Sequence, residues 1–158
     1  MSVYVEPELA DLTREADTGY MCSAHAYPIK VGPAIVSTLR NVDEAAFARI
    51  VPGGTRSAMA PGAQRHIVFG LEEFQASLDF SMGFWTGKAN AQAELTLKVT
   101  ALGEGNREIL RTVVSGEGSA RKEGDCPTGA QALTEAVNKA VKRAAEEYVF
   151  KVINAQQL

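Results

Sequence analysis

The chain has 158 residues, 46% of them hydrophobic and 22% charged, a balance that is typical of one globular domain and excludes a disordered or fibrous protein. Its formal net charge of -3 lacks the surplus of lysine and arginine that binding to phosphates requires, so we expect no nucleic-acid partner. No run of about 18 apolar residues is present to span a membrane, and the first residues, MSVYVE, have neither the basic start nor the apolar core of a signal peptide.

The amino-terminal segment is the least regular part of the chain. Residues 3–5 (VYV) favour a short strand, which we interpret as an edge strand, and residues 6–18 have no sustained period and predict a loop. We therefore expect a single domain over residues 1–158, in which residues 1–20 form a less regular amino-terminal segment.

Residues 32–50 predict the first long helix. Their apolar side chains would form one stripe, because they recur every three or four residues. These positions are Ile35, Leu39, Val42, Ala46 and Ile50. Pro33 suits the first turn of this helix, and the sequence PGG at 52–54 would end it. The next segment, residues 55–64, has no period, so we expect a loop.

Two long strands are predicted after this loop. Between residues 67 and 80 apolar and polar residues alternate, but the parity changes at Glu72 and Glu73. Either a bulge with one extra residue or a bend between two strands would restore it. From Lys88 to Thr100 the alternation is unbroken, with Ala, Leu and Val on one side and polar residues on the other. This pattern predicts a strand with one buried face and one face in water.

Hairpin-type connections flank the second of these strands. Residues 81–87 join it to the preceding strand, and residues 103–106 join it to a third strand around residues 109–119. Gly116 and Gly118 lie inside that third strand and indicate a twist or a bulge near its end.

The carboxy-terminal residues predict a long amphipathic helix. Thr128 and Gln131 fit a capping box at its start. Its apolar stripe consists of Leu133, Val137, Ala140, Val141, Ala144, Tyr148 and Val152. Because Ala136, Ala140 and Ala144 have little bulk, this helix would lie close to the alanine-rich face of the strand at 88–100.

The order of the predicted elements is β-α-β-β-β-α, without an internal repeat. This order predicts an α/β (α+β) fold, namely a two-layer sandwich with a mainly antiparallel sheet and two helices on one face. The polar side of the strand at 88–100 would be exposed in a monomer and partly buried in a ring.

Cys22, His25, His66 and Cys126 are the only cysteines and histidines of the chain. Their number suits tetrahedral zinc, but only Cys22 and His25 are close in sequence, whereas structural zinc sites usually supply two close pairs. We therefore expect no metal, no cofactor and no catalytic residue. The two cysteines would form a disulfide in an exported protein or remain reduced thiols in a cytoplasmic one.

Large side chains in two predicted loops are the candidate interface residues. Met82, Phe84 and Trp85, the only tryptophan, lie in the connection at 81–87, and Tyr20 and Tyr27 precede the first helix. Such side chains either dock on a partner or close the open end of the sandwich as a small core.

Four short segments resemble a group of bacterial cell-envelope lipoproteins. They are VGPAI at residues 31–35, AFARI at 46–50, RTVVSGEG at 111–118 and ALTEAVNKA at 132–140. The group includes YajG-like lipoproteins, accessory lipoproteins of lipopolysaccharide transport and polysaccharide export, and the periplasmic part of the curli secretion lipoprotein. The resemblance implies a non-catalytic part of a secretion or assembly machine, often a ring or a plug. It also implies membrane attachment only through a lipidated cysteine, an anchor that we expect to be absent from this chain.

We therefore expect an accessory or assembly subunit without enzymatic activity, located in the periplasm and associated with the outer membrane. Its expected partners are envelope proteins or further copies of itself as a homo-oligomer or ring. The alternative function is a small ligand-binding or enzymatic domain with a cleft formed by Cys22, His25 and His66, and the alternative location is the cytoplasm.

Overall fold

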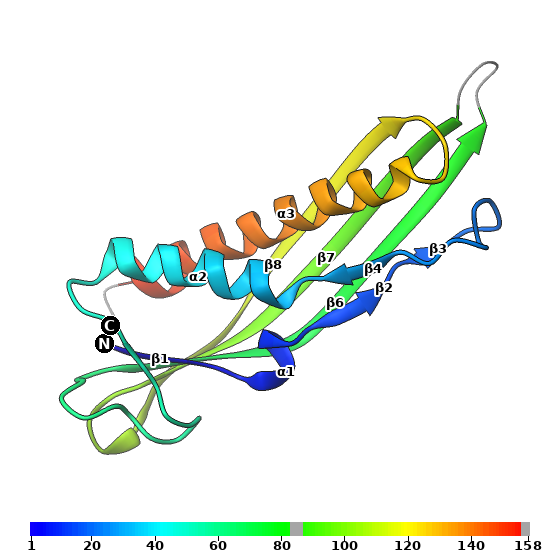
Figure 1. Ribbon diagram of the computed structural model, residues 1–158. Coiled ribbons are helices and arrows are strands. Elements are labelled where there is room, and N and C mark those ends of the chain that lie inside the picture. The colour runs from blue at the N-terminus through cyan, green and yellow to red at the C-terminus, as the bar shows by residue number, and fades with distance from the viewer. Residues whose placement is uncertain (83–86, 156–158) are drawn as a thin grey trace.

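A computed structural model describes residues 1–82 and 87–155 (Figure 1). Its main layer is a sheet in which the strands follow the order β5-β1-β6-β7-β8. The strands β6 (His66–Met82), β7 (Gly87–Leu102) and β8 (Glu108–Glu123) form a long antiparallel meander. The short strands β1 (Ser2–Val5) and β5 (Val51–Pro52) extend this sheet in parallel at the end that holds the amino terminus.

Two long helices cover one face of this sheet. They are α2 (Gly32–Ala46) and α3 (Thr128–Tyr148), and α3 continues into a π-helical turn, η2 (Val149–Ile153) (Figure 1). A 3-10 turn, η1 (Glu104–Asn106), connects β7 to β8. This arrangement confirms the predicted α+β sandwich with a mostly antiparallel sheet. Among the described helices, none is long and apolar enough to cross a membrane.

The segment between β1 and α2 is more regular than its sequence indicates. It contains the one-turn helix α1 (Pro7–Ala10), and β2 (Thr13–Glu15) pairs with β4 (Pro28–Lys30) in a separate antiparallel ribbon. Strand β3 (Asp17–Thr18) pairs in parallel with the far part of β6. The edge position expected for residues 3–5 is wrong, because β1 lies between β5 and β6.

Helix α2 ends at Ala46, before the predicted end at residue 50. Phe47 has extended backbone angles, and Val51 pairs with Ser2 in the parallel ladder of β5 and β1. The residues after Ala46 therefore leave the helix to reach the sheet. The buried side chains of α2 are those of Ile35, Leu39 and Asp43.

A β-bulge in β6 explains the change of parity at Glu72 and Glu73. The register against β7 shifts between Leu71 and Glu73, so one extra residue returns the apolar side chains to the core. Leu71 and Phe74 accordingly both pack against the core between the two layers. Of the two alternatives, the bulge is the one that the structure contains.

The closest contact between the two layers is that of α3 with β8. A methyl group added at Gly118 would overlap the carbonyl oxygen of Ala136, and one added at Gly116 would overlap that of Ala140. The glycines therefore let the helix backbone rest on the strand backbone. The bulge suggested by these glycines is wrong, because β8 pairs with β7 there without a register shift.

The start of α3 also differs from its prediction. Pro127 is the residue that precedes the helix, and no side chain caps it. Thr128 lies inside the first turn, where its hydroxyl donates a hydrogen bond to Asp125 Oδ1 (3.4 Å). The predicted capping box of Thr128 and Gln131 is therefore wrong.

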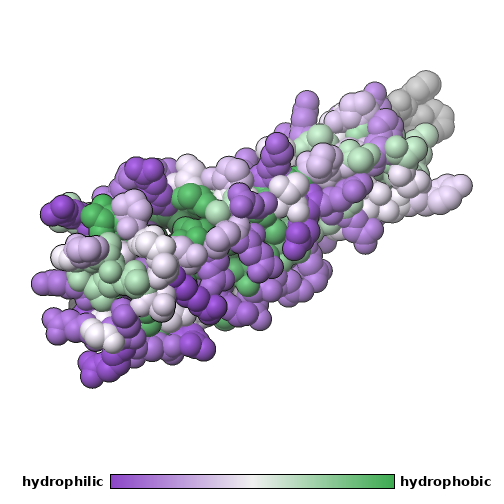
Figure 2. All heavy atoms as spheres, turned by 60° about the horizontal axis from the view of Figure 1, so that its bottom comes forward, coloured by the Kyte–Doolittle hydropathy of each residue, from purple (hydrophilic) through white to green (hydrophobic). Residues whose placement is uncertain are grey.

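The other face of the sheet is polar, and neither α2 nor α3 covers it (Figure 1). Figure 2, in which the lower side of Figure 1 comes forward, shows polar residues over most of the surface with apolar patches between them. On this face Lys98 pairs with Glu72 (2.6 Å) and Lys88 with Glu123 (3.9 Å). The predicted wet side of the strand at 88–100 is thus half-buried or exposed.

We expect Gly118→Ala to lower the free energy of unfolding by about 2 kcal/mol, because the added methyl group forces α3 away from β8. Urea unfolding followed by circular dichroism measures this change. The matched control is Gly54→Ala, since a Cβ at Gly54 meets no atom within 4 Å, and its effect should stay within about 0.5 kcal/mol. Equal losses for the two variants would contradict the close contact.

Candidate functional site

A disulfide joins Cys22 to Cys126, which are 104 residues apart in sequence and have their Cα atoms 5.6 Å apart. It ties the loop before β4 to the start of α3. The Tyr27 hydroxyl donates a hydrogen bond to the carbonyl oxygen of Cys126 (2.8 Å) at the same place. Because both sulfurs are bonded, the pair offers neither a thiolate nucleophile nor a thiolate metal ligand.

His66 is the first residue of β6, far from the disulfide, and its side chain has a structural role. Its Nε2 is 3.1 Å from the Thr55 carbonyl oxygen, so Nε2 carries the proton and Nδ1 accepts a hydrogen bond from the Ser2 hydroxyl (2.9 Å). The side chains of His66 and Ser2 are fully buried. These contacts hold the loop after β5 against β1 and β6.

The expected cleft of Cys22, His25 and His66 does not form. Tyr27, near the disulfide, packs beside Phe80 with ring centroids 6.3 Å apart, and Phe80 lies about 45 Å from His66 along β6 at ~3.3 Å per residue. His25 is exposed near Tyr27. Among the described residues, no group of three or more His, Cys, Asp or Glu is arranged to hold a metal ion.

The candidate interface residues divide into three groups. Tyr20 and Met82 are 97% and 76% exposed. Met82 is the last residue of β6 and Tyr20 follows β3, and the ends of these two strands lie at the end of the molecule that is remote from the amino terminus (Figure 1). Tyr27 is buried in the core between the layers, so the interface prediction is wrong for this residue. Phe84 and Trp85 lie outside the residues that the structure describes.

Helix α3 caps the outer edge of β8 with side chains. Four residues spaced by four along the helix reach main-chain groups of alternate strand residues. Lys139, Arg143 and Lys151 donate to the carbonyl oxygens of Ser119 (2.9 Å), Glu117 (3.0 Å) and Val113 (3.1 Å), and the Ser115 N–H donates to the Glu147 carboxylate. Four residues of a helix rise about 6 Å, and two residues of a strand rise about 6.8 Å. Every fourth helix residue therefore stays nearly level with every second strand residue.

The carboxylate of Glu147 is held in its charged form in this row. Burial alone would raise its pKa, but the Lys151 ammonium (2.8 Å) and the Ser115 N–H together hold the pKa of Glu147 below its ordinary value. A charged carboxylate is the stronger acceptor for the strand N–H. The β8 edge is therefore bonded to its own helix.

The opposite edge of the meander is open along part of β6. Strand β1 pairs with residues 66–69, and β3 pairs with residues 77–78. Within the described part of the chain, no strand pairs with residues 70–76 on that side. A gap in the edge thus lies between two short parallel partners.

Main-chain groups face this gap. The Leu78 carbonyl oxygen accepts a hydrogen bond from the Gly19 N–H at this edge. Residues of a strand direct their main-chain groups to alternate sides, so those of Ala76 and Phe74 point toward the gap as well.

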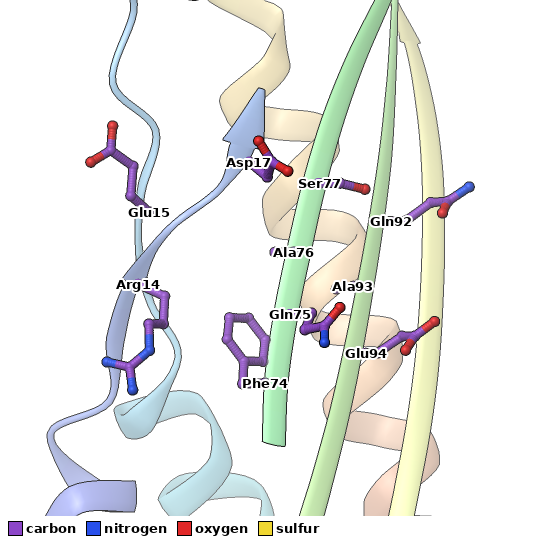
Figure 3. Close-up of a pocket in the computed structure, with 10 residues that line it drawn as sticks. All are labelled: Arg14, Glu15, Asp17, Phe74, Gln75, Ala76, Ser77, Gln92, Ala93 and Glu94. Carbon is purple, nitrogen blue, oxygen red and sulfur yellow. The ribbon is translucent and has the colours of Figure 1, made fainter. Parts of the chain in front are cut away.

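A hollow of about 390 Å³ lies beside the gap, between β2 and β6 (Figure 3). Figure 3 shows Phe74 projecting from β6 into this space, with Arg14 across from it on β2. Glu15, Asp17 and Glu94 also line the hollow, so its lining has three carboxylates and one guanidinium. We call this the edge hollow. The sequence did not predict the edge hollow, because the hollow exists only when β2 pairs with β4 and not with β6.

A buried polar pair joins α2 to α3. The Tyr148 hydroxyl donates a hydrogen bond to Asp43 Oδ1 (2.7 Å), and both side chains are buried. Oδ2 of Asp43 has no hydrogen-bond partner among the described residues. Burial raises the pKa of Asp43 to about 6, and the hydrogen bond from Tyr148 opposes part of this rise. The apolar pattern missed Asp43, although its place four residues after Leu39 was a signal of burial.

Comparisons with known proteins identify the fold but no family. No family model matches this chain, and no curated protein matches its sequence. The structure is similar to a minor lipoprotein from Acinetobacter baumannii, with a TM-score of 0.50 and 7% identity over 98% of this chain and 92% of that chain. A hypothetical protein from Chlamydia trachomatis gives a TM-score of 0.41 and 10% identity over 98% of this chain and 94% of that chain. The likeness to the lipoprotein concerns the fold alone.

We expect Asp43→Asn to become more stable relative to the native chain as the pH rises. The raised pKa of Asp43 means that its contribution to stability is complete below the ordinary value of 3.8 and is lost as the pH rises through about 6. The difference in free energy of unfolding should change by about 2 kcal/mol between pH 4 and pH 8, as measured by urea unfolding. Asp79→Asn, on the exposed face, is the matched control. A similar pH dependence for both differences would contradict the buried origin.

Proposed function

We propose that this chain is a non-catalytic accessory or assembly subunit of a bacterial envelope machine, located in the periplasm and associated with the outer membrane through protein contacts. The disulfide between Cys22 and Cys126 is the observation that carries the proposal. Disulfides persist in oxidising compartments such as the periplasm and are rare in the cytosol. A fold shared with a protein described as a minor lipoprotein agrees with this location.

Binding is the role that the described side chains support. Both cysteines are bonded to each other, and the ring nitrogens of His66 are engaged by Ser2 and Thr55. The same molecule exposes the large side chains of Tyr20 and Met82 at one end. Exposed Tyr and other large side chains are frequent anchors of protein interfaces. The partners are therefore envelope proteins or further copies of this chain.

Cell fractionation combined with thiol alkylation tests the location. In the cells that produce this protein we expect the chain in the periplasmic or outer-membrane fraction, with no cysteine alkylated before a reductant is added, because both sulfurs are bonded. A chain found in the cytosolic fraction with two alkylated thiols would contradict the proposal.

We expect the double variant Tyr20→Ser/Met82→Ser to weaken capture of the envelope partner about tenfold, because a few exposed anchors carry most of the binding free energy of an interface. Its melting temperature should not fall, since both side chains are exposed. Cross-linking in intact cells measures capture. The matched control is Phe150→Ser, because Phe150 is 75% exposed but lies beyond the other end of α3. Equal capture by the double variant and the native chain would remove these two residues from the interface.

A further inference from the structure

The two long edges of the meander differ in their hydrogen bonding. On β8, side chains of α3 bond alternate main-chain groups over residues 113–119. On β6, residues 70–76 keep an unpaired edge between β1 and β3. An unpaired edge is a template for a further strand. Proteins commonly protect an edge that binds no partner by covering it or by placing charged side chains on it. This fold blunts residues 113–119 of one edge, whereas residues 74–77 of the other edge line an open hollow.

We propose that residues 70–76 of β6 bind one extended segment of a partner protein, which adds to the sheet as a strand between β1 and β3. Strand addition of this kind draws its affinity from main-chain hydrogen bonds and its specificity from alternate side chains. The inference rests on the proposed function in taking the partner to be a protein. It goes further in naming the place and the conformation of the bound segment.

The gap has the length of an ordinary strand. Seven residues span about 23 Å at ~3.3 Å each, and the mean strand has about five or six residues. The main-chain groups of Phe74 and Ala76 face the gap, as the bond between Gly19 and Leu78 indicates. A segment of five or six residues would bond these groups and make the edge continuous from β1 to β3.

The residues of β2, which lie beside the gap, pair with β4 and not with β6. Continuing the register of β3 and β6 toward the amino terminus would set Arg14 opposite Phe74. Arg14 pairs instead with Ile29 in the ribbon of β2 and β4. This choice leaves the edge hollow of about 390 Å³ between β2 and β6 and so keeps the β6 edge accessible.

The lining of the edge hollow indicates the chemistry of the bound segment. Glu15, Asp17 and Glu94 outnumber Arg14, so the lining favours basic side chains. Phe74 projects into the same space and offers an apolar contact (Figure 3). Side chains of a strand alternate between two faces. The segment that fits is therefore one in which apolar and basic residues alternate.

Titration of the full chain with the peptide acetyl-VKVRVK-amide tests the site. We expect its addition to shift the amide NMR signals of residues 70–76 and to slow hydrogen exchange at Phe74 and Ala76. A peptide of the same sequence with every main-chain nitrogen methylated should bind at least tenfold more weakly, and so should acetyl-VEVEVE-amide. Equal affinity of the methylated peptide, signal shifts confined to other residues, or the lack of any shift would overturn the proposal.

Charge reversal tests the site without altering the β6 backbone. We expect Glu94→Lys to weaken binding of acetyl-VKVRVK-amide about tenfold and to strengthen binding of acetyl-VEVEVE-amide. The matched control is Glu123→Lys, because Glu123 is an exposed glutamate on β8 that does not line the edge hollow. Its effect should be less than threefold. Equal effects of the two reversals would show that net charge, not the edge hollow, attracts the peptide, and would overturn the proposal.

Ala76→Pro removes one main-chain N–H that faces the gap, and its effect separates this inference from the proposed function. We expect it to abolish both peptide binding and cross-linking to the envelope partner. If cross-linking in cells persists, the strand site is overturned while the proposed function stands, whereas a cytosolic location would overturn the proposed function whatever the peptide does. A native mass of twice that of the monomer, reduced to the monomer mass by Ala76→Pro, would mean that a second copy of this chain fills the edge. That result would overturn the proposal that a segment of a partner protein binds there.

Discussion

The packing of α3 on β8 is the constraint on which the rest of the structure depends. Gly116 and Gly118 on the strand meet Ala136 and Ala140 on the helix, so the two backbones touch without side chains between them. At this short separation the next row of helix residues reaches beyond the strand. Lys139, Arg143, Glu147 and Lys151 then bond the main chain of β8. One packing contact thus sets the distance between the layers and brings α3 into hydrogen bonding with residues 113–119 of the β8 edge.

The asymmetry of the sheet follows from this contact. Its helix-facing side is buried by α2 and α3, and its β8 edge is bonded to α3. Three surfaces lie outside these contacts, namely the polar face, the end that bears Tyr20 and Met82, and the stretch of β6 beside the edge hollow. All three are suited to contacts with another chain. The polar face carries exposed ion pairs, such as Lys98 with Glu72. Exposed ion pairs contribute little to the free energy of unfolding.

Local patterns in the sequence predicted the parts of the fold that local physics determines. The alternation from Lys88 to Thr100 predicted β7, and the change of parity at Glu72 and Glu73 predicted an irregularity in β6. Features that depend on residues far away in the sequence could not be predicted from local patterns. The end of α2 depends on the pairing of Val51 with Ser2. The role of Gly118 depends on its contact with Ala136 of α3, which follows later in the chain.

The candidate site was less predictable than the fold, for the same reason. The state of Cys22 and Cys126 depends on the compartment, which residue spacing does not encode, and Tyr27 is buried by contacts with residues far away in the sequence, such as Phe80. The disulfide also has a mechanical consequence. Residues 22–126 form a covalent loop that contains β6, β7 and β8. A force that pulls the two termini apart runs through the sulfur atoms and extends only the segments outside this loop. The backbone of the meander therefore carries no tension, whereas β1, β3 and α3 lie outside the covalent loop and take up the extension.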